Sequence, residues 1–310
     1  MCMTIRDKYI DPFTDFGFKH IFGTEENKRF LISFLNDLLE LDDNIIDIEY
    51  RNLEKLGLSI LDRKAIFDVY CTDEKNNNFI VELQRSPQRY FKDRSIYYTS
   101  FPIQEQSKKG DWDYRLSKIY FIGILEFSFD DLRLKTTQKR NKYLTKVQLL
   151  DCDEKEVFYD KLTYYYLEMP KFRKTEKELS SHLDYWLYYL NNIANMTQIP
   201  EVLKQDELIE EAFGVAEFLA LDKDKQFEYQ QDLKARWDNK ACLDFAEETG
   251  MEKGMEKGME KGIKKGMEKG LEKGEKKKAL EIAKSLLDVL DIETIALKTG
   301  LSSKEIELLK

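Results

Sequence analysis

Histidine and cysteine are scarce in this chain of 310 residues. The two histidines, His20 and His182, are too few for a metal site built from several imidazoles. The four cysteines lie far apart and form no C-x-x-C pair, which excludes a zinc cluster of cysteines and predicts reduced thiols. A metal bound by this chain would therefore be held by oxygen ligands, as Mg²⁺, Mn²⁺ or Ca²⁺ usually is.

Long apolar runs are also absent. No stretch approaches the roughly 20 apolar residues of a membrane-spanning helix, and residues 1–8 lack the apolar core of a signal peptide. We therefore expect no membrane partner and a cytoplasmic location. The formal net charge of −9 does not favour a nucleic-acid binder, so DNA binding would depend on a local basic patch.

The hydrophobic pattern predicts an α/β domain over residues 1–172. Apolar residues recur at helical spacing over 25–40, and a second, partly basic helix is expected over 87–109. The order of helices and strands indicates a sheet covered by helices. The expected strands are 45–50, 64–73, 77–85, 118–127, 143–150 and 162–168.

Three further segments follow. Residues 173–249 carry apolar side chains at helical spacing, and residues 250–278 repeat the motif MEKG every four positions. The repeat predicts either a long helix that forms a homo-oligomer or packs on its own protein, or a flexible charged linker. Residues 279–310 predict a small helical tail, whose last helix opens with Ser302 and Glu305 in a capping box. Because that helix has few basic residues, we expect it to pack rather than to read DNA.

Three polar side chains fall on the two strands of a predicted hairpin. Asp68 and Glu82 lie at a similar distance from the Asn-rich turn at 73–78, so antiparallel pairing would bring them to one level of the sheet. Glu82 and Gln84 are two residues apart and point to the same face. Such charges can also face solvent on a surface sheet. The apolar neighbours of both carboxylates favour burial, and a buried carboxylate needs a partner or a metal.

Two converging carboxylates suit a magnesium site that also includes a backbone carbonyl and waters. Hydrolysis of a phosphodiester places more negative charge on a phosphate that is already negative, and a divalent ion neutralises it and activates water. The segment after the hairpin is basic and interleaved with tyrosines, so it can present cations to DNA, although a solvated helix face would look similar. The candidate DNA-binding residues are Arg85, Arg89, Lys92, Arg94 and Tyr98.

The hairpin AIFDVYCTDEKNNNFIVELQ, followed by RYFKDRSIYYTSF, resembles the PD-(D/E)XK nuclease superfamily. More narrowly, the chain resembles the Rpn group of recombination-promoting nucleases or putative transposases. The opening DPFTDFGFKHIFG (11–23), the segment EMPKF (168–172) and the Glu-Lys-Gly repeat before a helical tail carry the same resemblance.

The resemblance implies a restriction-endonuclease-like fold and a magnesium-dependent DNA endonuclease that promotes recombination. Asp68 and Glu82 would be metal ligands, and both would be catalytic together with Gln84, which stands at the position of the usual catalytic lysine. Glutamine supplies a hydrogen bond but no positive charge, so the sequence departs from the superfamily here. The alternative is a weak or inactive nuclease fold that binds DNA or another protein as a dimer.

Accessory residues are expected near this site. A lysine elsewhere in the chain would have to supply the missing charge, and Lys19 and Lys64 are the candidates. The superfamily often has another acid on its first helix, for which Asp15 and Glu25 are the candidates.

Overall fold

The structure is a computed structural model of the whole chain, and it describes residues 8–52, 54–55, 65–107, 113–130 and 141–309. Its contacts divide the chain into two compact units, Met1–Arg236 and Trp237–Lys310. The predicted domain boundaries after residues 172, 249 and 278 stay predictions. Each unit is described separately below.

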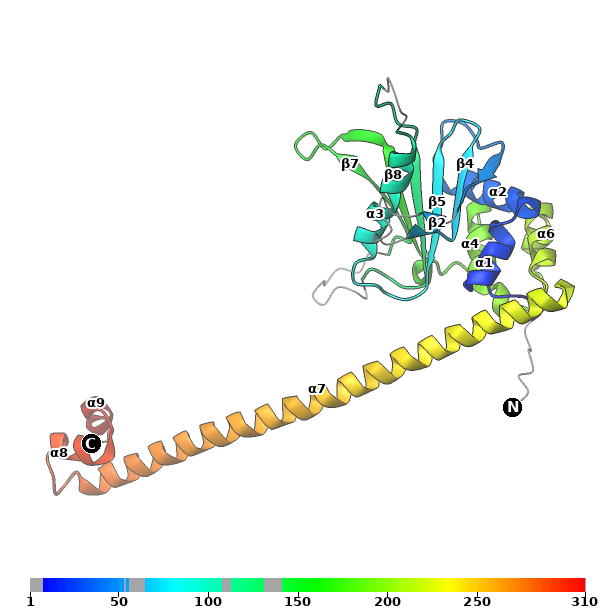
Figure 1. Cartoon of the computed structure of the whole chain (residues 1–310). Coiled ribbons are helices and arrows are strands. Elements are labelled where there is room, and N and C mark those ends of the chain that lie inside the picture. The colour runs from blue at the N-terminus through cyan, green and yellow to red at the C-terminus, as the bar shows by residue number, and fades with distance from the viewer. Residues whose placement is uncertain (1–7, 53, 56–64, 108–112, 131–140, 310) are drawn as a thin grey trace. The chain divides into compact units, whose positions relative to one another are not determined.

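The first unit contains a six-stranded mixed sheet with the order β1-β4-β5-β6-β8-β7 (Figure 1). β1 pairs antiparallel with β4, and β4 pairs antiparallel with β5. β5, β6 and β8 run parallel to one another, and β7 pairs antiparallel with β8 at the edge of the sheet. A separate pair joins β2 (Glu54–Lys55) to β3 (Ala65–Ile66). The strands of the main sheet are β1 (Ile48–Tyr50), β4 (Val69–Asp73), β5 (Asn78–Gln84), β6 (Ile119–Leu125), β7 (Leu144–Leu150) and β8 (Val157–Glu168).

Helices cover both faces of this sheet, which confirms the predicted α/β class (Figure 1). The larger core packs residues of α1, α2, α4 and α6 on one face, whereas α3 packs on the other face over Ile80, Phe121 and Tyr166. The central strands β5 and β6 are buried on both faces, which explains their nearly continuous apolar sequence. The helices are α1 (Asp15–Phe22), α2 (Lys28–Leu38), α3 (Phe91–Glu105), α4 (His182–Asn192), α5 (Glu201–Lys204) and α6 (Glu207–Val215).

Two predicted strands differ from the observed ones. The strand expected over 64–73 is interrupted, because Phe67 and Asp68 separate β3 from β4. Asp68 lies at a bend, and its carboxylate accepts a hydrogen bond from the backbone N–H of Leu83 in β5. A side chain therefore replaces a backbone partner at this point of the hairpin. The strand expected over 162–168 begins earlier, at Val157, because its first residues pair with the end of β7.

The predicted turn between β4 and β5 is present. Asn76 adopts φ 60°, in the left-handed region that asparagine tolerates. The carboxylate of Asp73 accepts hydrogen bonds from the backbone N–H groups of Lys75 and Asn77. These bonds fix the hairpin register, which pairs Val69 with Val81.

The segment 11–17 before the sheet is fixed by local hydrogen bonds. Thr14 caps α1 by accepting from the backbone N–H of Gly17, at 2.9 Å, and its hydroxyl donates to the backbone carbonyl of Asp11. A Cβ at Gly17 would lie 2.2 Å from that carbonyl oxygen, so only glycine fits here. This part of the opening motif therefore has a structural role.

Helix α7 (Lys223–Leu286) starts in the first unit and continues through the whole MEKG repeat. In the second unit it is followed by α8 (Ile292–Thr299) and α9 (Ser303–Glu307). These elements share a small core of Ala283, Ile295, Leu301 and Ile306. Ser302 and Glu305 form the predicted capping box of α9. No helix among the described residues is long and apolar enough to cross a membrane.

Short 3₁₀ turns connect several of these elements. Their bounds are Glu25–Asn27, Met169–Lys171, Glu176–Glu178, Ile193–Asn195 and Phe218–Ala220. The turn at 169–171 contains most of the motif EMPKF. Glu168 is buried and accepts hydrogen bonds from the Ser128 hydroxyl and the Phe129 backbone, and it pairs with Lys171 at 2.8 Å. This motif therefore anchors the segment after β6.

Candidate active site

The two predicted carboxylates lie at one end of the β4–β5 hairpin. Val69 pairs with Val81, so Asp68 and Glu82 are the next residues along each strand. Asp68 Oδ2 accepts a hydrogen bond of 2.7 Å from the backbone N–H of Leu83, the residue after Glu82. The two carboxylates are close enough for the negative charge of Asp68 to act on Glu82.

Burial disfavours the ionised form of both carboxyl groups. Glu82 is only 6% exposed, and burial together with the negative charge of Asp68 raises the pKa of Glu82 well above its ordinary value. Burial is also the main cause that raises the pKa of Asp68, to about 6. Glu82 Oε2 is buried and has no hydrogen-bond partner among the described residues. An unpaired buried carboxylate oxygen is costly, and a bound cation would remove that cost.

Arg94 on α3 brings a positive charge to the site. Its Nη2 lies 3.1 Å from Glu82 Oε1 and also donates to Gln84 Oε1. The amide nitrogen of Gln84 donates to the backbone carbonyl of Ser86, so the orientation of the amide is fixed from both ends. The sequence assigned Arg94 to the DNA-binding surface, but the structure places it against Glu82 and Gln84.

Helix α1 contributes two charges nearby. The negative charge of Asp15 raises the pKa of Asp68, and the positive charge of Lys19 lowers it. Asp15 and Lys19 also form an ion pair of 3.0 Å with each other. Of the accessory candidates, these two lie near the carboxylates. Glu25 pairs instead with Lys28, and Lys64 lies outside the described residues.

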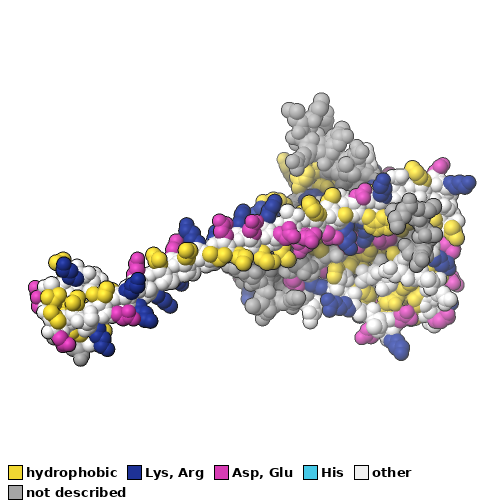
Figure 2. Space-filling view, turned by 90° about the horizontal axis from the view of Figure 1, so that it is seen from below, with side chains coloured by type: hydrophobic (Ala, Val, Ile, Leu, Met, Phe, Trp, Pro, Cys, Tyr) yellow, Lys and Arg dark blue, Asp and Glu magenta, His cyan; other side chains and the backbone are white. Residues whose placement is uncertain are grey.

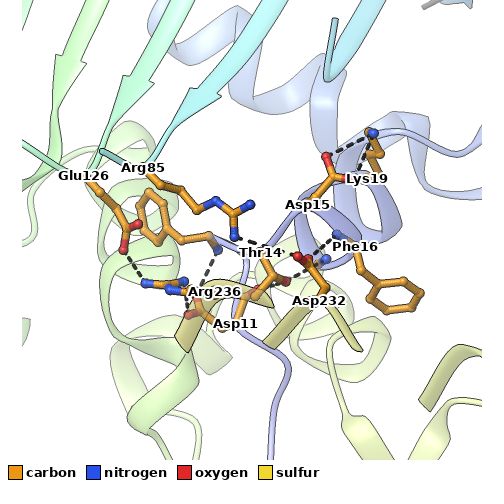
Figure 3. Close-up of polar contacts among 11 residues, drawn as sticks. Asp11, Thr14, Asp15, Phe16, Lys19, Arg85, Glu126, Asp232 and Arg236 are labelled. Atoms are coloured by element: carbon orange, nitrogen blue, oxygen red, sulfur yellow. Dashed lines mark hydrogen bonds and ion pairs between the residues drawn. The ribbon is translucent and has the colours of Figure 1, made fainter. Parts of the chain in front are cut away.

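An ion-pair cluster lies beside α1 and is drawn in Figure 3. Arg236 on α7 pairs with Asp11 at 2.5 Å and with Glu126 at 2.6 Å. Arg85 points toward Asp232, at 3.8 Å, and the same carboxylate accepts a hydrogen bond from the backbone N–H of Phe16. Arg85 is therefore turned toward a carboxylate of its own chain.

The remaining candidates for DNA binding lie on or next to α3. Arg89 and Lys92 are exposed, with Arg89 over the ring of Tyr90 and Lys92 over the ring of Phe129. Tyr98 is half-buried, and its ring lies 5.5 Å from the guanidinium carbon of Arg94. These three stay candidates for contact with a substrate.

Sequence reasoning did not find the partners of these charged residues. Asp232 and Arg236 are more than 200 positions from Asp11 and Phe16, and they lie in a helix with no motif of its own. The helical spacing of Gln88, Phe91, Arg94 and Tyr98 places them on one side of α3, and this was the available signal for Arg94. The sequence pattern does not indicate that the side of α3 with Arg94 faces Glu82.

The donor set fits a hard divalent cation. A buried carboxylate with an unpaired oxygen, Glu82, and a partly buried one, Asp68, match the oxygen ligands that Mg²⁺ and Mn²⁺ prefer. Within the described part of the chain, no group of three or more His, Cys, Asp and Glu side chains has the arrangement of a metal site. An ion held by Asp68 and Glu82 would therefore need its remaining ligands from backbone oxygens or water.

A six-stranded mixed sheet flanked by helices is the architecture of the restriction-endonuclease-like class of nuclease folds. A sequence model of the PD-(D/E)XK nuclease family transposases matches residues 12–246, which is more than half of the chain. The chain belongs to this family. A search of curated proteins and a search of solved structures each found no match.

Membership of the family gives the general function. The protein has a nuclease-type domain, and the substrate that this family implies is DNA. Nucleases of the PD-(D/E)XK type generally use divalent metal ions. The residues matched by the family model include the whole sheet, α1, α3 and both carboxylates.

Proposed function

We propose that this protein is a magnesium-dependent DNA endonuclease whose active site contains Asp68, Glu82 and Gln84. The observation that carries the proposal is the pair of carboxylates at the end of the hairpin, Glu82 buried and Asp68 partly buried, with the unpaired Oε2 of Glu82 on the side chain that Arg94 of α3 contacts. Its biological role is recombination or a transposition-like event in the cytoplasm. A recombination assay in cells that carry the wild-type protein or Asp68→Ala tests that role.

Asp68 and Glu82 would hold the metal. When bound, a divalent ion neutralises negative charge on the phosphate and activates water for attack. The backbone N–H of Leu83 holds Asp68 in place at 2.7 Å, so this carboxylate is positioned before any ion arrives. Magnesium is the preferred ion because both side-chain ligands are carboxylates, and Mn²⁺ or Ca²⁺ would bind the same oxygens.

Arg94 and Gln84 would together do the work of the lysine that the superfamily usually has. Gln84 donates its amide N–H to Ser86 and accepts from Arg94, so it orients the guanidinium. The guanidinium group is a cation that binds phosphate oxygens well. A cation next to the scissile phosphate stabilises the charge that develops on its oxygens. Lys19 on α1 is the second cation whose charge acts on Asp68.

Plasmid cleavage tests the proposed activity. The purified protein is incubated with supercoiled plasmid and Mg²⁺, and parallel samples contain EDTA or the variant Asp68→Ala. The matched control is Glu49→Gln, since Glu49 is an exposed carboxylate on β1. We expect nicking or linearisation by the wild type and the control, and none with EDTA or Asp68→Ala.

The second candidate is a nuclease-fold protein that binds DNA or protein without cutting. The observation that favours it is Gln84 at the lysine position. An intact plasmid that is nevertheless retarded on a gel by the wild type would reject the endonuclease and support this alternative. Equal cleavage by the wild type and Asp68→Ala would also reject the proposed site.

We propose further that the repeat of α7 joins two copies of the chain. A row of hydrophobic side chains follows α7 between charged residues (Figure 2). Each member is at least 62% exposed, and a Cβ at any repeat glycine would meet no atom within 4 Å. Exposed apolar rows of this length are typical of protein interfaces. The row consists of Met251, Met255, Met259, Ile263, Met267 and Leu271.

A second copy is the favoured occupant because every repeat of the row except that of Ile263 carries both Glu and Lys beside the row, so two copies can pair opposite charges. A spacing of four residues drifts by about 40° per repeat, which favours a crossing of the two helices along i±4 ridges. Sedimentation velocity of the full chain measures the mass. We expect a dimer for the wild type and for Glu49→Gln, which lies outside the repeat, and a monomer for Met255→Glu with Met259→Glu. A monomeric wild type would reject the dimer.

A further inference from the structure

Two tyrosines on the outer side of α3 bracket the residue that contacts Glu82. Tyr90 stands immediately before α3 and is 64% exposed, and Tyr97 is 44% exposed. They are seven residues apart, so they lie on the same side of the helix about two turns from each other. Arg94 lies between them along the chain, on the adjoining side of the helix nearer the sheet, and its Nη2 lies 3.1 Å from Glu82 Oε1.

The exposed rings are held in place by their neighbours. Tyr97 makes an edge-on contact with Phe101, whose ring centroid is 5.1 Å away. Arg89 lies over the ring of Tyr90, with its guanidinium carbon 5.4 Å from the ring centroid. Side chains fixed in this way lose little conformational freedom when a ligand binds them. A flat, exposed aromatic next to a cation is the usual platform for a nucleotide base and its phosphate.

The cations around the site do not suit an intact duplex. Lys19, Arg85 and Arg94 each pair with a carboxylate of the chain. In the described part of α3 and its approach, Arg89 and Lys92 are the basic residues outside any ion pair. Binding of double-stranded DNA depends on several free cations that contact phosphates on both strands. A net charge of −9 adds no long-range attraction.

We propose that Tyr90 and Tyr97 bind an unpaired DNA strand, with a base stacked on each ring and Arg89 at a phosphate. The proposal rests on the proposed function, because it makes unpaired DNA the substrate class of that same site. The two rings are about 10 Å apart along the helix, roughly three base steps of 3.4 Å. The backbone between the two stacked bases would then pass over Arg94, beside Glu82. A paired base exposes no free face to such a ring, so single strands, flaps and gaps would be preferred.

Fluorescence anisotropy tests this preference in EDTA, where cleavage does not occur. The probes are a fluorescein-labelled strand of about 20 thymidines and a duplex of the same length. We expect the wild type to bind the single strand at least about tenfold more tightly than the duplex. In Tyr90→Ala with Tyr97→Ala, the loss of two stacking rings should weaken binding of the single strand by about 10²-fold.

Two matched variants separate stacking from other effects. Tyr90→Phe with Tyr97→Phe keeps both rings and should bind like the wild type. Tyr114→Ala removes a ring that is 79% exposed outside α3 and should also bind like the wild type. Circular dichroism melting confirms that each variant folds.

Several results would overturn the proposal. They are equal affinity for strand and duplex, no loss in the double alanine variant, an equal loss in the double phenylalanine variant, or tighter binding of an RNA strand of uridines. Plasmid cleavage is scored separately. A protein that cuts plasmid without preferring the single strand would reject this inference alone. One that prefers the single strand without cutting would reject the endonuclease alone.

Discussion

Nη2 of Arg94 lies 3.1 Å from Oε1 of Glu82, and this ion pair connects helix α3 to strand β5 at the centre of the candidate site. The same nitrogen donates to Gln84, which lies two residues after Glu82 on β5. The positive charge is therefore present at the site, but it comes from the helix that follows the hairpin.

Metal binding should be measurable without any substrate. Addition of Mg²⁺ or Mn²⁺ at about 100 times its dissociation constant should raise the free energy of unfolding by about 2.7 kcal/mol, because the ion binds only the folded chain. Differential scanning fluorimetry measures the corresponding rise in melting temperature. Glu82→Gln should abolish the rise, and Glu49→Gln should preserve it. An equal rise in both variants would place the ion elsewhere.

In the metal-free protein, ionisation of Asp68 should lower the free energy of unfolding. Burial raises the pKa of Asp68 from 3.8 to about 6, so the folded chain binds a proton more tightly than the unfolded chain. Stability from this group is therefore present below about pH 4 and is lost as the pH rises to about 6, by up to about 3 kcal/mol. Asp68→Asn, which carries no charge, should be more stable than the wild type in EDTA at pH 8.

Urea unfolding at two pH values measures this effect. The advantage of Asp68→Asn should be about 1–3 kcal/mol at pH 8 and close to zero at pH 4. A wild type that is the more stable protein at pH 8 would mean that Lys19 and Arg94 compensate the charge fully. Because Asp68 must lose its proton before it can bind an ion, the affinity of the wild type for Mg²⁺ should rise as the pH increases through about 6.

A lysine introduced at position 84 should not help by itself. Gln84→Lys would place an ammonium group against the guanidinium of Arg94, and the two like charges would repel each other. We expect plasmid nicking to fall by about tenfold or more, since the cation is displaced from the phosphate. Gln84→Lys combined with Arg94→Gln returns the site to a single cation and should recover most of the activity.

Single-turnover cleavage rates measure this series, with Arg94→Gln alone as the comparison. Arg94→Gln alone should lose about 10²-fold, as removal of a transition-state donor usually does. If Gln84→Lys alone is more active than the wild type, Arg94 does not act as the site's cation. If the double variant is no better than either single variant, the two residues do not share this role.

The first helix should tolerate no side chain at position 17. A Cβ at Gly17 would lie 2.2 Å from the carbonyl oxygen of Asp11, so Gly17→Ala should lower the free energy of unfolding by about 1–3 kcal/mol. Gly214→Ala is the matched control, because a Cβ there would meet no atom within 4 Å inside helix α6. That substitution should stabilise the protein by up to about 1 kcal/mol. Chemical denaturation measures both, and a neutral Gly17→Ala would contradict the proposed packing.

The β4–β5 hairpin shows how much short-range patterns can predict. Asparagine tolerates the left-handed backbone of the turn, and alternating apolar residues set the faces of the strands, so the hairpin and the level of Asp68 and Glu82 follow from local rules. The bend at Asp68 was missed, because its cause is a hydrogen bond to Leu83 on the neighbouring strand. Strand propensity alone does not register such a bond.

Charged residues were harder to place. Arg85 and Arg94 both read as contacts for DNA, because a run of basic residues near a candidate site looks the same whether it faces solvent or protein. In the structure Arg85 meets Asp232 and Arg94 meets Glu82. The preference of a cation for one carboxylate over another depends on distance and burial, and neither is encoded in local spacing.

By itself the sequence determined the fold class, the family and the two carboxylates, because hydrophobic period, turn residues and motif order are local properties of the chain. Only the tertiary structure decided which charges act on those carboxylates. Arg94 arrives from α3, Lys19 and Asp15 act from α1, and Asp232 and Arg236 bind the opening motif from more than 200 residues away. Electrostatic interactions depend on separation in space and on exclusion of water, and both of these are set only when the helices pack on the sheet.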